Sequence, residues 1–295
     1  MLAFLISVFL LSAFVQANTT PALALDRVQQ TLSDDVYQLL ISDAPTATSS
    51  CGVNGPASCQ GGNTTASCCY ESPGGLLAHV QFWDANPATG PPTNWTIHGL
   101  WPDHCNGTYK ASCDKSRNYT DLGSIFDQAG RPDLGNFLST WMLSNDERRA
   151  DRPIALQNSN GHPQKFWEHE WDHHGTCVNT LSPNCLPPGS PRGTEAVYYF
   201  SQIATLFQNQ TTYEWLARHN IIPSVNETFT LEQFTSAIQA EWGHIPALQC
   251  QNGAIFEIYY YYNLKGSMID GEFVSIDAPN SGNCLGSFHY LPKNE

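Results

Sequence analysis

The sequence predicts an α+β fold, with a central antiparallel sheet flanked by helices in a single disulfide-stapled domain. Two observations lead to this prediction. Strand-like and helix-like segments are mixed, without the repeating βαβ order of a parallel sheet. The ten cysteines are an even number in a chain that begins like an exported protein, so we expect them to pair.

The first residues precede the predicted domain, which we place at 51–295. Residues 1–17 are typical of a cleaved secretory signal peptide, because their apolar run is too short to cross a bilayer and ends in small residues. A buried helix or a membrane anchor is the alternative. Residues 18–50 form an N-terminal extension and linker, either a propeptide or a helix docked on the domain. No later segment is apolar enough to cross a membrane.

Strands are predicted at three segments rich in aromatic and β-branched residues: 76–83, 95–101 and 255–264. The last contains four consecutive tyrosines, which suit a sheet packed on both faces. Asp270-Gly271 is a hairpin turn signal. Helices are expected at 133–144, 165–177, 194–208, 212–219 and 230–242. Thr230 and Gln233 form a capping box for the last helix.

The charge argues against a general nucleic-acid-binding protein. The net charge is −14, and only 13 lysines and arginines are available to neutralise phosphates. Protonation of all ten histidines would bring the net charge to about −4. An enzyme of this composition that handles a polyanion should therefore work best at acid pH and contact few nucleotides.

Seven Asn-x-Ser/Thr sequons agree with export and glycosylation: Asn18, Asn63, Asn94, Asn106, Asn118, Asn209 and Asn226. Together with the signal and the cysteines, they indicate a secreted glycoprotein. A vacuolar or lysosome-like compartment is the alternative.

Two segments combine titratable side chains with aromatic residues. Residues 95–103 read WTIHGLWPD, with His98 at the centre. Residues 165–177 read KFWEHEWDHHGTC and carry His169, Glu170, His173 and His174. On a helix these side chains share a face, so a carboxylate and up to three imidazoles line one wall. A carboxylate raises the pKa of an imidazole and burial lowers it, which is how acid–base pairs are tuned.

One chemistry that fits these residues is zinc hydrolysis. Residues 169–173 read H-E-x-x-H, the signature of a zinc-protease helix. The extended form of this signature fails, because Thr176 stands in place of its glycine and Asn179 in place of its third histidine. A zinc protease would also leave His98 without a role.

The other chemistry is phosphoryl transfer within RNA. It needs a base for the 2′-hydroxyl, an acid for the departing 5′-oxygen, and positive charge or donors near the phosphate. Two histidines from separate segments and a charged cluster meet these needs. The 2′-oxygen of RNA is the nucleophile, so no metal or cofactor is required and DNA is not cleaved.

The two segments resemble the active-site motifs of the ribonuclease T2 family of secreted and vacuolar acid ribonucleases. HGLWP at 98–102 matches the first motif without change. Residues 166–177 match the second, F-W-x-H-E-W-x-K-H-G-T-C, with His173 in place of lysine. The resemblance covers about residues 51–295, and the cysteines resemble those of the fungal branch. It implies an endoribonuclease that converts single-stranded RNA into 2′,3′-cyclic phosphates and then 3′-phosphates, with low base specificity. We expect a monomer.

The resemblance implies a role for each residue of the cluster. His98 would be the general acid and His174 the general base, and these roles reverse in the second step. Glu170 would hold or polarise the phosphate and tune His174, while His169 would bind phosphate. His173 would supply the positive charge of the family lysine only when protonated. We therefore expect a lower rate near neutral pH and a steeper requirement for acid.

The resemblance also implies two base sites. The first consists of Trp101, Asp103 and Tyr109, in which rings stack on a base and the carboxylate accepts from an exocyclic amine. Such a carboxylate suggests a modest preference for adenine. Phe166 would serve the second site. Core packing is the alternative for Trp101 and Phe166, and a surface position is the alternative for Tyr109.

The disulfide pattern of the family carries over as Cys51–Cys69, Cys59–Cys105, Cys68–Cys185, Cys113–Cys177 and Cys250–Cys284. Spacing alone does not give this connectivity, although neighbouring Cys68 and Cys69 should bond different partners. A third hypothesis, besides the ribonuclease and the zinc protease, is a secreted binding or toxin-like protein that lost catalysis through His173.

Overall fold

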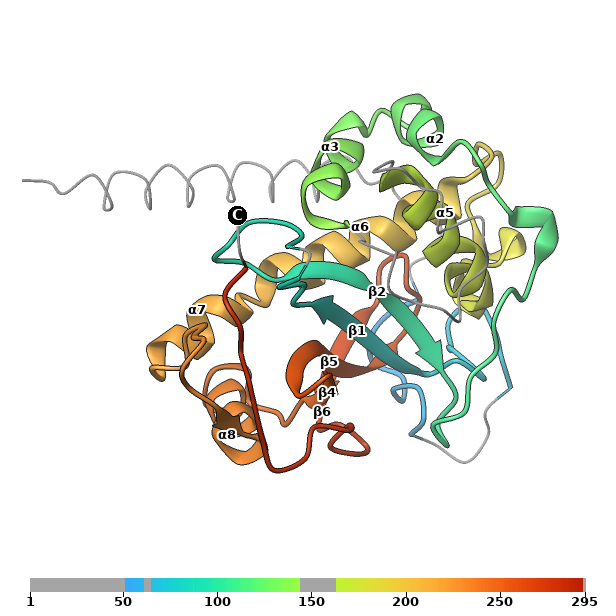
Figure 1. Ribbon diagram of the computed structural model, residues 1–295. Helices are drawn as coiled ribbons and strands as arrows, with labels where there is room; N and C mark the ends of the chain where they lie inside the picture. Colours follow the sequence, from blue (N-terminus) through green and yellow to red (C-terminus); the bar gives the residue numbers. More distant parts are fainter. Residues whose placement is uncertain (1–50, 61–64, 87, 144–162, 294–295) are drawn as a thin grey trace, which may run out of the picture. The chain divides into compact units, whose positions relative to one another are not determined.

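The computed structural model describes residues 51–60, 65–86, 88–143 and 163–293 (Figure 1). The predicted signal peptide at 1–17 and the extension at 18–50 lie outside these residues. Within the described segments, no helix has the length and apolar character needed to cross a membrane.

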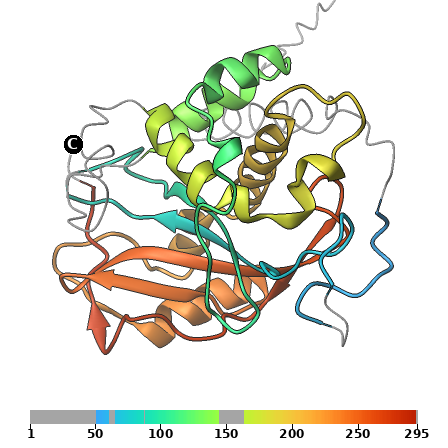
Figure 2. The ribbon, with the colours of Figure 1, turned by 90° about the vertical axis from the view of Figure 1, so that its right-hand side faces the viewer.

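A five-stranded antiparallel sheet forms the centre of the fold (Figures 1 and 2). Its strands are β1 (Leu76–Phe82), β2 (Thr96–Asp103), β4 (Ala247–Gln251), β5 (Ala254–Lys265) and β6 (Glu272–Ile276). They lie in the order β2-β1-β5-β4, and β6 pairs with β5 in the hairpin that Asp270-Gly271 predicts. The three predicted strands are confirmed, whereas β4 was not predicted. β3 (Phe229–Thr230) and β7 (Ser287–Phe288) form a separate two-stranded sheet.

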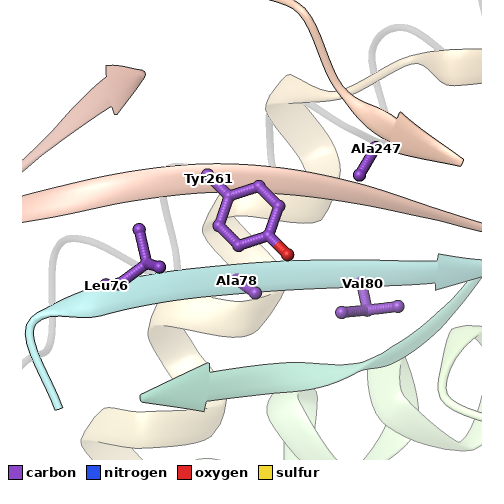
Figure 3. Close-up of a cluster of buried hydrophobic side chains, with 5 residues drawn as sticks. All are labelled: Leu76, Ala78, Val80, Ala247 and Tyr261. Atoms are coloured by element: carbon purple, nitrogen blue, oxygen red, sulfur yellow. The ribbon is translucent and has the colours of Figure 1, made fainter. Parts of the chain in front are cut away.

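The sheet is packed on both faces, as the run of tyrosines predicts. β1 is buried along its whole length. On one face a cluster of apolar side chains joins three strands (Figure 3): Leu76, Ala78, Val80, Ala247 and Tyr261. Because side chains alternate along a strand, His79 and Gln81 point to the opposite face, where both contact Gln210.

Six α-helices surround the sheet in the described part of the chain: α2 (Leu122–Gln128), α3 (Pro132–Trp141), α5 (Pro163–His173), α6 (Thr194–Asn209), α7 (Thr212–Arg218) and α8 (Leu231–Trp242). The five predicted helices are confirmed, and the short α2 was not predicted. α8 starts with the predicted capping box of Thr230 and Gln233. In Figure 1, α2, α3 and α5 lie together at one end, and α6 runs from there towards α7.

The helix expected at 165–177 is shorter in the structure. α5 ends at His173, and a separate 3-10 turn, Gly175–Cys177, follows it. A Cβ atom at Gly175 would collide with the ring of Trp171, so only glycine lets the chain turn this closely over the indole. His174 therefore lies just beyond the helix, although its N–H still donates to the carbonyl of Glu170.

Five disulfides staple the domain, with the same pairs that the resemblance implies: Cys51–Cys69, Cys59–Cys105, Cys68–Cys185, Cys113–Cys177 and Cys250–Cys284. The adjacent Cys68 and Cys69 do bond different partners. A bridge that closes a long loop contributes about 2–4 kcal/mol to stability. The Cys113–Cys177 bridge ties the segment after α5 to the loop that follows Tyr109.

Candidate active site

His98 lies at a β-bulge in β2. In the β1–β2 ladder Gln81 pairs with Ile97 and Val80 with Gly99, which leaves His98 as the extra residue. Such a bulge bends the strand and redirects a side chain. The imidazole is fully buried and stacks on the ring of Phe82, with centroids 3.9 Å apart. The sheet itself therefore holds this histidine in place.

Glu170 reaches the same point from α5. Its Oε1 lies 3.5 Å from Nε2 of His98, and its Oε2 lies 3.9 Å from Nε2 of His174. The indole N–H of Trp101 donates to Oε2 at 3.0 Å. One buried carboxylate thus lies against imidazoles from both sequence motifs.

The close approach of α5 to β2 depends on Gly99. A Cβ atom built on Gly99 would collide with Oε2 of Glu170 and would lie 3.0 Å from Nε1 of Trp101. The glycine of the HGLWP motif therefore gives the carboxylate the room it occupies beside His98. This is a packing requirement, because the backbone of Gly99 is not in the left-handed region.

The electrostatics of Glu170 favour an ionised carboxylate. Burial raises its pKa, but the charge and hydrogen bond of His98, together with the charges of His174 and His169, bring the pKa well below the ordinary value. An anionic group fixed among imidazoles can hold their protons in defined positions.

The surroundings of His174 favour its neutral form instead. Burial lowers its pKa to about 3, although the charge of Glu170 raises it, and the charges of His173, His98 and His169 lower it further. The side chain is 13% exposed and its ring stacks on Trp101, with centroids 4.9 Å apart. At mildly acid pH His174 is thus a neutral imidazole, the form that can accept a proton.

His169 and His173 stack on each other, with ring centroids 5.0 Å apart, and His173 meets His174 edge-on at 4.8 Å. The predicted imidazole wall therefore exists. In the H-E-x-x-H hypothesis Glu170 would accompany His169 and His173 at a metal, but its carboxylate faces His98 and Trp101 instead. Among the described residues, no three His, Cys, Asp or Glu side chains are arranged to hold a metal ion.

Sequence analysis missed Glu257, on β5. Its Oε1 lies 2.9 Å from Nδ1 of His98, and its Oε2 accepts a hydrogen bond of 2.7 Å from the hydroxyl of Tyr259. No motif marks this residue. A signal was nevertheless available, since a lone carboxylate between the apolar residues Phe256 and Ile258 of a strand must find a partner when it is buried.

The residues expected to bind bases differ in their exposure to solvent. Trp101 is half-buried and already stacks on His174. Phe166 is only 3% exposed and lies beside His98, with centroids 5.8 Å apart. Tyr109 is 67% exposed on a loop. Burial raises the pKa of Asp103, at the end of β2, to about 7.

Comparison with known proteins finds the same family throughout. The sequence profile of the Ribonuclease T2 family matches residues 57–277. Ribonuclease Le2 of Lentinula edodes is 46% identical over 247 residues, which cover 83% of this chain and 98% of that protein. Ribonuclease T2 of Aspergillus oryzae is 40% identical over 247 residues, which cover 83% and 84%. The crystal structure of Actibind, a T2 ribonuclease, has a TM-score of 0.75 at 38% identity and covers 84% of this chain and 99% of that chain.

Proposed function

The chain belongs to the ribonuclease T2 family and is a T2-type endoribonuclease, and from this premise we propose how its site cleaves RNA. His174 takes the proton of the 2′-hydroxyl, whose oxygen attacks the phosphorus. His98 protonates the departing 5′-oxygen, and a 2′,3′-cyclic phosphate forms. In the second step the roles reverse, and water opens the ring to a 3′-phosphate.

The observation that carries this mechanism is that His98 and His174 meet around Glu170. Nε2 of each ring lies within 4 Å of the same carboxylate, so both rings can reach one phosphate bound beside it. His174 is neutral at acid pH, as a base must be. His98 lies between Glu170 and Glu257, so that each ring nitrogen faces a carboxylate that can accept its N–H.

RNA reaches these groups only if a covering side chain moves, because His98 and Glu170 are 0% exposed. The side chain that covers them is Trp101, which contacts His98, Glu170 and His174. Its ring stacks on His174 and meets His98 at 4.8 Å in a T-shaped arrangement, and its N–H donates to Glu170. When the indole moves, a base of the RNA could stack on it in place of the His174 ring.

Positive charge at the phosphate would come from His169 and His173. Both are imidazoles, so they carry this charge only in acid, and we propose an acid pH optimum for this reason. The ordinary pKa of a histidine is about 6.5. At neutral pH the site therefore loses cations that a lysine would keep.

Asp103, Trp101, Tyr109 and Phe166 would form the two base sites. At acid pH the buried carboxyl of Asp103 is protonated, since its pKa is about 7. A neutral carboxyl can donate through its hydroxyl and accept through its carbonyl, which complements the ring nitrogen and amino group of adenine. With Trp101 and exposed Tyr109 as stacking surfaces, this favours adenine modestly. Phe166, beside His98, would form part of the second base site.

The five disulfides support the proposal that the enzyme works outside the cytosol, as a secreted protein or in an acid vacuole. We also propose that it acts as a monomer.

Digestion of defined dinucleotides at pH 4 to 8, with and without a chelator, tests this function. We expect cyclic phosphate and then 3′-phosphate, equal rates with chelator, and no cleavage of the deoxy analogues. His98→Ala should lower kcat by about 10²–10⁴-fold. Activity that the chelator abolishes would support the H-E-x-x-H hypothesis instead. Intact RNA at every pH would identify a binding protein without catalysis.

A further inference from the structure

The reaction proposed above depends on which nitrogen of His98 carries the transferable proton. Building on that proposed function, we propose that Glu257 is a positioning residue. Together with Tyr259, it fixes the tautomer and the orientation of the His98 ring and stabilises its protonated form. Glu257 acts through His98 and does not touch the substrate.

The hydrogen-bond pattern defines the tautomer. Tyr259 donates to Oε2 of Glu257, and Oε1 lies 2.9 Å from Nδ1 of His98. A carboxylate only accepts hydrogen bonds, so Nδ1 must donate. The other nitrogen, Nε2, is then the one that faces Glu170, at 3.5 Å from Oε1. It is therefore Nε2 that exchanges a proton with RNA.

Burial strengthens the hydrogen bond between His98 and Glu257. His98 is 0% exposed and Glu257 is 2% exposed, so water screens neither group. A charge-assisted hydrogen bond in such surroundings is stronger than one at the surface. When His98 gains a proton, the carboxylate of Glu257 is already in place to balance the charge on Nδ1.

Three neighbouring strands supply the parts of the arrangement. His98 comes from the bulge in β2, its stacking partner Phe82 from β1, and Glu257 from β5. Phe82 and Glu257 are directly paired across the β1–β5 ladder. Because the bulge redirects His98 across β1, its ring reaches a residue two strands away. Groups held by a sheet are positioned more rigidly than groups on loops.

The titratable groups that face His98 include Glu170 of α5, Glu257 of β5 and His174. Glu170 and Glu257 lie at different nitrogens, so their effects can be separated. Glu170 is placed to meet the phosphate, whereas Glu257 lies at the nitrogen directed away from it. Only the loss of Glu257 should let the proton of the neutral His98 ring move between Nδ1 and Nε2 while leaving the phosphate contacts intact.

Glu257→Gln tests this role in the full-length enzyme with a dinucleotide substrate. We expect kcat to fall about 10- to 100-fold, as for loss of an orienting partner elsewhere, with KM changed less than about twofold. The alkaline limb of the pH–kcat profile should move to lower pH, because the protonated His98 loses its carboxylate. Tyr259→Phe, which removes one donor to Glu257, should shift the same limb by a smaller amount.

Proton NMR provides a readout that does not depend on activity. In the wild-type enzyme the Nδ1–H of His98 should give a low-field resonance that is absent in both His98→Ala and Glu257→Gln. A wild-type spectrum without this resonance would overturn the proposal even if Glu257→Gln fails to fold. A folded Glu257→Gln variant with unchanged kcat and pH profile would overturn it as well.

The same experiment separates this inference from the proposed function. If His98→Ala retains full activity, the assignment of His98 as the acid is wrong, whatever Glu257→Gln does. If His98→Ala is inactive and Glu257→Gln behaves as wild type, only the positioning role is wrong.

Discussion

Glu170 and Glu71 are both fully buried carboxyl groups, at 0% and 1% exposure, yet their surroundings have opposite effects. Burial raises the pKa of each. For Glu71, the backbone N–H groups of Thr180 and Asn179 and the hydroxyl of Thr180 only partly offset burial, and the pKa is about 7. For Glu170, the charge and hydrogen bond of His98 outweigh burial, and the pKa falls below its ordinary value.

The comparison shows that burial alone does not make a carboxylate functional. Neutral donors satisfy Glu71, and these hydrogen bonds hold the segment after α5 in place, which is a structural task. The charge and hydrogen bond of His98 keep Glu170 ionised in the interior, which is what a reaction that moves protons requires. The charge of the partners thus distinguishes the two sites.

Replacing Glu170 or Glu71 with glutamine should give the largest difference in activity between the two sites. Glu170→Gln removes the anion between the two imidazoles, and we expect kcat/KM for a dinucleotide to fall about 10²–10³-fold. Glu71→Gln, the matched control, should stay within about threefold of wild type. Steady-state kinetics at acid pH would measure both. Equal losses in the two variants would show that the contrast is not functional.

The same control should reveal a pH-dependent stability. The pKa of Glu71 is about 7 in the folded protein against 4.5 when unfolded, so its contribution is greatest below pH 4.5 and is lost as the pH rises through 7. That loss amounts to about 3 kcal/mol. Urea unfolding should therefore show that, relative to wild type, the free energy of unfolding of Glu71→Gln is higher at pH 8 than at pH 4.5. A difference in unfolding free energy that is the same at both pH values would contradict the raised pKa of Glu71.

The space around Glu170 offers a sharper test. Gly99→Ala would push a methyl group into the carboxylate of Glu170, and we expect kcat to fall about 10- to 100-fold because Glu170 shifts from His98. Gly55→Ala, whose Cβ would meet nothing within 4 Å, is the control and should be neutral. A crystal structure of Gly99→Ala with an undisturbed Glu170 would contradict this explanation.

The smallest effect is expected at His173, which adds a cation beside His169 and His174 only when it is protonated. His173→Lys would keep that charge at every pH, so the rate at pH 7 should rise about three- to tenfold while the rate at pH 4.5 changes little. Complete pH–rate profiles of both proteins would measure this. Superimposable profiles would rule out a role for the charge at this position.

Local patterns in the sequence determined much of this protein. Strands β1, β2 and β5 follow from their aromatic and β-branched residues, and α8 from its capping box, because these are interactions between neighbours in the chain. Likewise, the spacing of four residues between Glu170 and His174 brings them together at the end of α5, where the N–H of His174 still donates to the carbonyl of Glu170. The two motifs identified the histidine cluster before any fold was known.

Tertiary structure alone decided how that cluster works. No local rule places a bulge at His98, carries its ring across β1 to Glu257, or brings Glu170 against it, since each contact joins segments far apart in the chain. Nor could the sequence tell that the pKa of Glu170 is lowered while that of Glu71 is raised to about 7. A pKa depends on burial and on charges brought close by folding, and these belong to the packed molecule.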